Sequence, residues 1–142
     1  MIRLSALLFA GCACLAACAT TDTTTSTPAR VVLSDAEFQP LRKDAFASDE
    51  YDVWEQKAQA LLARNDLTQP QRAEVYYGRA VMRGVYVRDG KYAFPKCATK
   101  DFEKFLSLAP EGHALIGKAH ENIAYQISRY HHFADASPAE CE

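Results

Sequence analysis

Residues 97–110 read CATKDFEKFLSLAP. Ala98, Phe102 and Phe105 follow one another at steps of four and three residues, a spacing that places all three on one face of an α-helix. Pro110 comes shortly afterwards, and a proline favours the end of a helix because it lacks a backbone N–H. The stretch therefore predicts a helix over residues 97–108 with one apolar face.

Apolar residues recur at similar three- and four-residue steps in residues 49–64, 72–86 and 111–130, so each segment predicts an amphipathic helix. Thr68 and Pro70 are typical of the start of the second of these helices. The positions expected to be buried are Val53, Trp54, Ala58, Leu61, Leu62, Ala73, Tyr76, Tyr77, Ala80, Val81, Leu115, Ile116, Ala119, Ile123 and Ile127.

Two shorter segments need separate treatment. Ser34 and Glu37 have the spacing of a capping box, which starts a helix, but Pro40 is expected to interrupt that helix after a short length. Residues 87–96 contain the turn pair Asp89-Gly90 between aromatic and aliphatic residues, and they predict either a small hairpin or a packed loop.

The helical segments contain an internal repeat. Residues 76–86 and 115–125 show the same order of residue types at a single offset, 117 − 78 = 39. Gly78 and Gly117 are equivalent in this alignment. Because glycine has no β-carbon, we expect both residues to let the second helix of each pair approach closely.

The alanine, the two phenylalanines and the proline of the opening stretch resemble the second helix of a tetratricopeptide repeat, and the resemblance covers about residues 50–130. It implies an all-α fold, a short TPR-like array of antiparallel helical hairpins with about four to five helices. This domain would span residues 34–131 and be followed by a tail over residues 132–142. A generic four- or five-helix bundle is the alternative.

In tetratricopeptide arrays the first helices of the hairpins line a concave groove that receives peptides or partner helices. Carried over to this chain, the resemblance places in the groove Arg72, Val75, Arg79, Met82, Arg83, Ala114, Lys118 and Asn122. The cationic side chains of this groove would bind an acidic peptide or a C-terminal carboxylate. The alternative is a solvated charged face in which the arginines pair with nearby glutamates.

The N-terminus predicts a targeting segment. A basic start is followed by an apolar run that is too short to span a bilayer, as in a signal peptide over residues 1–17. The run ends in Leu-Ala-Ala-Cys, which resembles the lipobox of bacterial lipoproteins and implies that Cys18 carries the diacylglyceryl and palmitate chains. Cys12 follows a poorer lipobox, and a plain secretory signal with an unmodified Cys18 is a further alternative.

The residues that follow Cys18 predict which membrane holds the protein and how the domain is attached to it. By the rule of the lipoprotein family, Ala19 in place of an aspartate implies the outer membrane, on the periplasmic side. Residues 20–28 are rich in threonine and have almost no apolar surface, so residues 18–33 are expected to form the lipidated N-terminus and a flexible tether.

Two cysteines, Cys97 and Cys141, remain after the signal and the lipidated residue are set aside. In a helical hairpin array the start of the 97–108 helix lies near the end of the next helix, and the periplasm is oxidising, so we expect a disulfide between them. Two unrelated thiols are the alternative. A zinc site formed by the two cysteines with His131 and His132 is a further one, although the compact ligand pairs of such sites are absent.

The sequence shows no recognisable catalytic frame. His120-Glu121 begins a helix-borne protease motif, but Ala124 occupies the place of the second histidine. The formal net charge of −2 does not favour nucleic acid. We expect no enzyme activity, cofactor, metal or small-molecule substrate. The leading prediction is a lipid-anchored periplasmic adaptor for a protein partner; the alternatives are an envelope structural or stability lipoprotein without a peptide groove and a metal-binding envelope protein.

Overall fold

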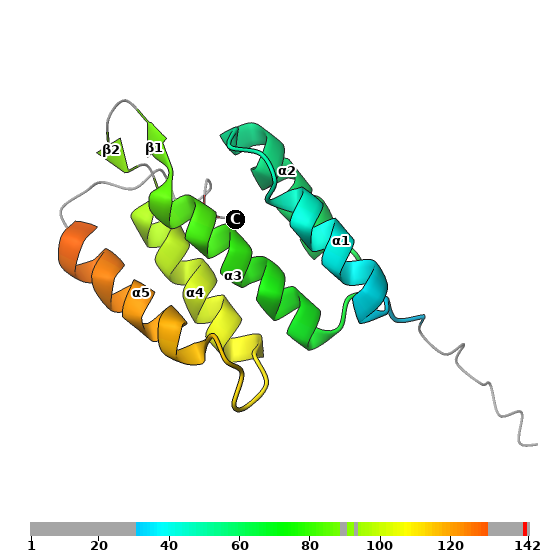
Figure 1. Ribbon diagram of the computed structural model, residues 1–142. Helices are drawn as coiled ribbons and strands as arrows, with labels where there is room; N and C mark the ends of the chain where they lie inside the picture. Colours follow the sequence, from blue (N-terminus) through cyan, green and yellow to red (C-terminus); the bar gives the residue numbers. More distant parts are fainter. Residues whose placement is uncertain (1–30, 89–90, 93, 131–140, 142) are drawn as a thin grey trace, which may run out of the picture.

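The computed structural model describes residues 31–88, 91–92, 94–130 and 141. These residues form the helices α1 (Asp35–Ala45), α2 (Tyr51–Leu62), α3 (Gln69–Val85), α4 (Pro95–Leu108) and α5 (Ile116–Tyr130). Consecutive helices run in opposite directions and lie side by side in chain order (Figure 1). The predicted all-α array of antiparallel helical hairpins is therefore confirmed.

Helix α1 is longer than the sequence predicted. The Ser34 side chain accepts a hydrogen bond from the Glu37 amide, and the Glu37 carboxylate accepts one from the Ser34 amide, which completes the capping box. Pro40 lies inside the helix and does not end it. The reason is that the ring removes only one backbone hydrogen bond, while burial of Phe38 and Ala45 holds the helix on the domain.

The segment between α3 and α4 forms a hairpin. Strand β1 (Val87–Arg88) pairs antiparallel with β2 (Lys91–Tyr92), and Val87 lies opposite Tyr92. Of the two structures that the sequence allowed here, the hairpin is the one present.

Helix α5 begins later than predicted. Gly112 has a φ of 78°, a left-handed conformation that interrupts helical geometry, so residues 111–115 form turns and α5 starts at Ile116. Near the other end of α5, Ile127 is 55% exposed, which contradicts its expected burial.

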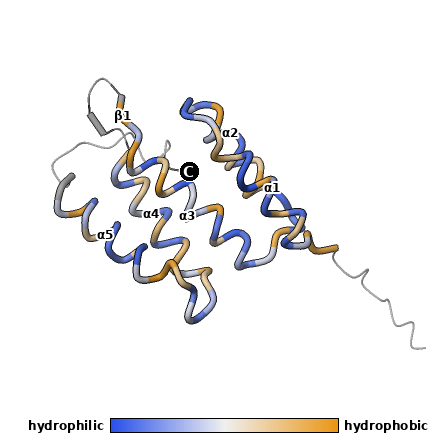
Figure 2. The backbone as a smooth tube through the Cα atoms, in the orientation of Figure 1, coloured by the Kyte–Doolittle hydropathy of each residue, from blue (hydrophilic) through white to orange (hydrophobic). Residues whose placement is uncertain are grey.

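Hydrophilic and hydrophobic residues alternate along each helix, as expected when only one face of the helix is buried (Figure 2). The apolar faces of the helices meet in two clusters. The first cluster joins α1, α2 and α3 and contains Phe38, Ala45, Ala58, Leu61, Leu67 and Val75. The second joins α3, α4 and α5 and contains Ala73, Ala80, Phe102, Phe105 and Ala119. The two phenylalanines of the opening stretch thus lie at the centre of the second cluster, where the ring of Tyr77 meets both of them edge-on.

The two glycines aligned by the internal repeat have different surroundings. A β-carbon at Gly78 would lie 2.4 Å from a ring carbon of Phe46, the residue that follows α1. A β-carbon at Gly117 would meet nothing within 4 Å. The expectation of close helix packing at both positions is therefore wrong: Gly78 accommodates a ring from the end of α1, and Gly117 faces open space.

Candidate functional site

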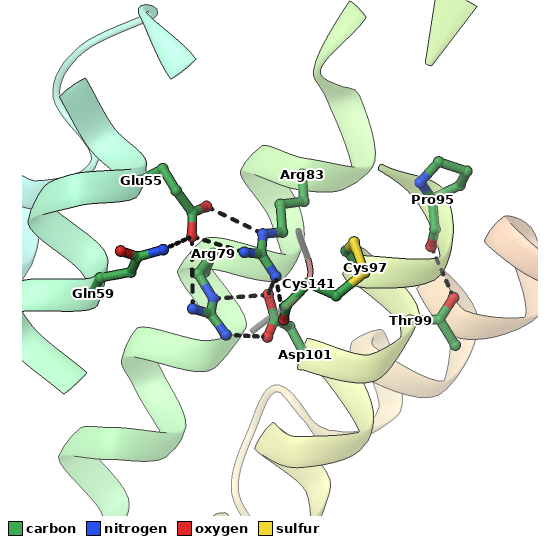
Figure 3. The surroundings of a disulfide bond; sticks show 9 residues. All are labelled: Glu55, Gln59, Arg79, Arg83, Pro95, Cys97, Thr99, Asp101 and Cys141. Atoms are coloured by element: carbon green, nitrogen blue, oxygen red, sulfur yellow. Dashed lines mark hydrogen bonds and ion pairs between the residues drawn. A yellow bond between two sulfur atoms is a disulfide. The ribbon is translucent and has the colours of Figure 1, made fainter. Parts of the chain in front are cut away.

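The two central arginines of the predicted groove do not face solvent. Arg79 and Arg83 of α3 are only 5% and 1% exposed. Their guanidinium groups point between α2 and α4, toward Glu55 and Asp101 (Figure 3). The prediction that they bind an acidic partner is therefore wrong, because acidic residues of the same chain already occupy their donors.

Arg79, Arg83, Glu55 and Asp101 form a buried ionic cluster. Arg79 donates to both Asp101 oxygens, with Nε at 2.9 Å from Oδ2 and Nη2 at 2.6 Å from Oδ1. Arg83 donates to both Glu55 oxygens, at 3.1 Å and 2.7 Å, and its Nη1 lies 3.0 Å from Asp101 Oδ2. The cluster is formally neutral and links α2, α3 and α4.

Burial and pairing oppose each other in this cluster. Burial raises the pKa of the Asp101 carboxyl, while the hydrogen bond and charge of Arg79 and the charge of Arg83 act in the opposite direction. Burial also lowers the pKa of Arg79, but the hydrogen bond to Asp101 and the charges of Asp101 and Glu55 outweigh that effect and raise it above its ordinary value. For Asp101 burial is the larger effect, and its pKa lies above its ordinary value. The support that the cluster gives to helix packing therefore rests on its geometry, in which each charged group has a partner.

The predicted disulfide lies beside this cluster. Cys97, in the first turn of α4, is bonded to Cys141, with their Cα atoms 5.0 Å apart (Figure 3). The carbonyl of Cys141 accepts a hydrogen bond from Arg83 Nη1 at 3.3 Å. With both sulfurs in the disulfide, neither cysteine is a thiolate ligand for zinc. His131 and His132 lie outside the described residues.

The other predicted groove residues are dispersed. Arg72 donates to the backbone carbonyls of Leu62 and Arg64, where it holds the turn after α2. Val75 is fully buried in the first apolar cluster. Lys118 is exposed and pairs with Glu121 at 3.0 Å.

Three further residues of the predicted groove are also at least partly accessible. Ala114 is exposed, Asn122 is half-buried, and Met82 is half-buried. Of the whole predicted set, only Met82 lines the groove that the structure shows between α1 and α3.

This α1–α3 groove is open and has a volume of about 850 Å³. Its lining consists of Gln39, Pro40, Arg42, Lys43, Phe46, Tyr77, Gly78, Val81 and Met82. Five of these side chains are apolar or aromatic, two are cationic and none is acidic. The apolar and cationic side chains of this open surface make it a candidate binding site.

Sequence reasoning missed the α1 side of the groove because Pro40 was expected to stop that helix. The available signal was Phe46, a large aromatic residue soon after the capping-box segment, together with Gly78, which can accept its ring.

The described residues contain neither a candidate metal site nor a candidate membrane span. Within residues 31–88, 91–92, 94–130 and 141, no three or more His, Cys, Asp or Glu side chains gather as a metal site. None of the helices described there combines the length and hydropathy needed to cross a bilayer.

Comparison of the chain with protein-family models, with curated proteins and with solved structures finds no match.

Proposed function

We propose that this protein is an outer-membrane, lipid-anchored adaptor that faces the periplasm and binds a protein or peptide partner through its TPR-like helical domain. The observation that carries the proposal is the α1–α3 groove, an open and mainly apolar surface on a scaffold of packed helical hairpins. The membrane attachment rests on the lipobox resemblance at Cys18, which lies outside the described residues.

Taken in chain order, the lipidated cysteine, the tether and the helical domain each fit the proposed role. Two or more acyl chains on Cys18 would hold the protein firmly at the membrane. A tether of about 15–20 residues gives a typical reach of roughly 20–25 Å. The domain then begins at a fixed point, because the Leu33 amide donates to the Asp66 carbonyl at 2.8 Å and the Leu33 side chain packs on the first apolar cluster. The predicted tether therefore ends before Leu33.

The helical domain is braced in a way that suits binding. The ionic cluster and the Cys97–Cys141 disulfide connect α2, α3 and α4. A surface whose supporting helices are fixed loses less conformational entropy when a partner binds. The α3 side of the groove is held in this way, and its α1 side packs on α2 and α3 through the first apolar cluster. Both contacts support a groove that is formed before the partner arrives.

Photocrosslinking in intact cells tests the adaptor proposal. A photoreactive amino acid replaces Val81, which lines the groove and is 37% exposed, or Leu41, which is 38% exposed and lies outside the groove lining. We expect a protein crosslink from position 81 and none from position 41. Equal crosslinking at both, or none at either, would favour a structural envelope lipoprotein over an adaptor.

The anchor is tested separately. We expect Cys18→Ala to abolish incorporation of labelled palmitate and to release the protein from membranes, while Cys12→Ala leaves both unchanged. Loss of labelling in Cys12→Ala alone would move the lipidation site to that residue.

A further inference from the structure

We propose that the α1–α3 groove binds an amphipathic segment of its protein partner, with an apolar side chain against Phe46 and an acidic side chain beside Arg42 and Lys43. This inference rests on the proposed adaptor function and gives the chemistry of the partner.

The apolar half of the groove is built on α3. Tyr77, Val81 and Met82 line it over about one turn of the helix, and Gly78 lies among them. Because Gly78 has no β-carbon, the ring of Phe46 rests against the α3 backbone and forms the floor. The position of Tyr77 in the lining is also fixed, because its ring packs edge-on against the aromatic residues Phe102 and Phe105 of α4.

The α3 side of the groove remains partly open to water. Val81 is 37% exposed and Met82 is half-buried. Covering such surface with an apolar side chain is favourable because it removes apolar area from water. A leucine or aromatic side chain of a partner would bury what the chain itself leaves uncovered.

The charged half of the groove lies on α1 and is cationic. The lining contains Arg42 and Lys43 and no acidic residue, although the whole chain has a formal net charge of −2. Lys43 is exposed and takes part in no ion pair within the described residues. Arg42 is already engaged within the chain: its Nε lies 3.3 Å from Glu74 Oε2, and its Nη1 donates to Gln39 Oε1 at 3.5 Å.

Lys43 leaves a place for a carboxylate at the α1 side of the groove. A partner's Asp or Glu side chain would pair with Lys43 and accept a charge-assisted hydrogen bond from its ammonium group, which is stronger than a hydrogen bond between neutral groups. The absence of acidic groups from the lining disfavours a basic segment by the same reasoning. Charge complementarity therefore selects an acidic, amphipathic segment as the occupant.

Selection from a phage-displayed library of random 12-residue peptides, with the purified oxidised protein as bait, tests the inference. We expect enriched peptides to combine Asp or Glu with aliphatic or aromatic residues. Binding of the best synthetic peptide should weaken at least about tenfold in Val81→Asp, which places a like charge in the groove. Lys43→Glu should shift the selection toward basic peptides. The matched control is Leu41→Asp, a change at equal exposure outside the groove lining, which should leave binding unchanged.

The outcomes separate this inference from the adaptor proposal. Circular dichroism melting of each variant shows whether its helical domain is folded, and Lys43→Glu, at an exposed position, serves as the second variant if Val81→Asp fails to fold. Failure to enrich any peptide, enrichment without acidic residues, or binding that Val81→Asp and Lys43→Glu leave unchanged would overturn the inference. The adaptor proposal would still stand if Val81 crosslinks to another protein in cells. A crosslink to lipid or to a second copy of this chain instead would overturn both.

Discussion

Replacement of Arg83 by methionine tests the role of the buried ionic cluster. Arg83 is 1% exposed and donates twice to Glu55, once to Asp101 and once to the carbonyl of Cys141. Methionine fills much of the same space, but the cluster then carries a net charge of −1 out of contact with water. Removal of one partner from a buried ion pair lowers stability by about 3–5 kcal/mol. Since a domain of ordinary stability unfolds with about 5–15 kcal/mol, we expect Arg83→Met to be close to unfolding at 37 °C.

Urea unfolding of the oxidised protein, followed by circular dichroism, measures this loss. The variant Glu55→Met/Arg83→Met leaves the neutral Arg79–Asp101 pair, so it should recover about 2–3 kcal/mol relative to the sum of the single changes. Arg64→Met is the control, because Arg64 makes a similar bidentate contact with Asp66 at the surface. Loss of this surface contact should have little effect on the free energy of unfolding. A loss below about 1 kcal/mol in Arg83→Met, or strict additivity in the double variant, would refute the view that this cluster holds the three helices together.

Three further expectations concern other parts of the fold. Cys141→Ser should lower the free energy of unfolding by about 4 kcal/mol on the chain-entropy model, and chemical reduction of the unmodified protein should lower its urea midpoint similarly; a much smaller loss would mean that the disulfide joins groups already held in place. Gly78→Ala should destabilise by about 1–3 kcal/mol, because its β-carbon would overlap a phenylalanine ring, whereas Gly117→Ala should be neutral or stabilise by up to about 1 kcal/mol; equal thermal shifts would contradict the packing described. The hydrogen bonds from Ser34 lower the pKa of Glu37 below its ordinary value of 4.5, so the stability they add is present above that pH and is lost as the pH falls through the folded-state pKa. Glu37→Gln should weaken the pH dependence of urea unfolding in that acidic range, and an unchanged dependence would argue against the capping contribution.

Much of the fold could be predicted from local sequence patterns. The periodicity of Ala98, Phe102 and Phe105 identified α4, and all three side chains are buried. Helix periodicity is a local property, so it can be recognised without knowing which other helices pack against the segment. The disulfide between Cys97 and Cys141 was predictable because hairpin geometry brings their surroundings together.

The buried cluster could not be predicted from the helix that carries its arginines. The spacing of Arg79 and Arg83 is the same whether their shared face meets water or two other helices. Their acidic partners lie 18 to 28 residues away along the chain. A partial signal was the position of Glu55 beside Trp54 and of Asp101 beside Phe102, since acidic residues next to large buried aromatics need partners.

The groove was misplaced for a related reason. The register taken from the tetratricopeptide resemblance put it between the arginine-bearing helix and the last helix. In the structure the open face lies toward α1, a helix whose length was underestimated because of Pro40. The effect of a proline depends on the tertiary contacts that surround it, and these are not local.

The position of the disulfide also restricts how two copies of this chain can exchange parts. The bond encloses α4 and α5 in a covalent loop with a sequence separation of 44 residues. If α5 left its own α4 to pack on that of another molecule, the loop would have to stretch between them or open. A domain-swapped dimer would therefore arise from the reduced chain and, once oxidised, would join Cys97 of one copy to Cys141 of the other. Such a dimer would stay covalently linked after denaturation without reducing agent, so the intermolecular disulfide would show that the swap had taken place.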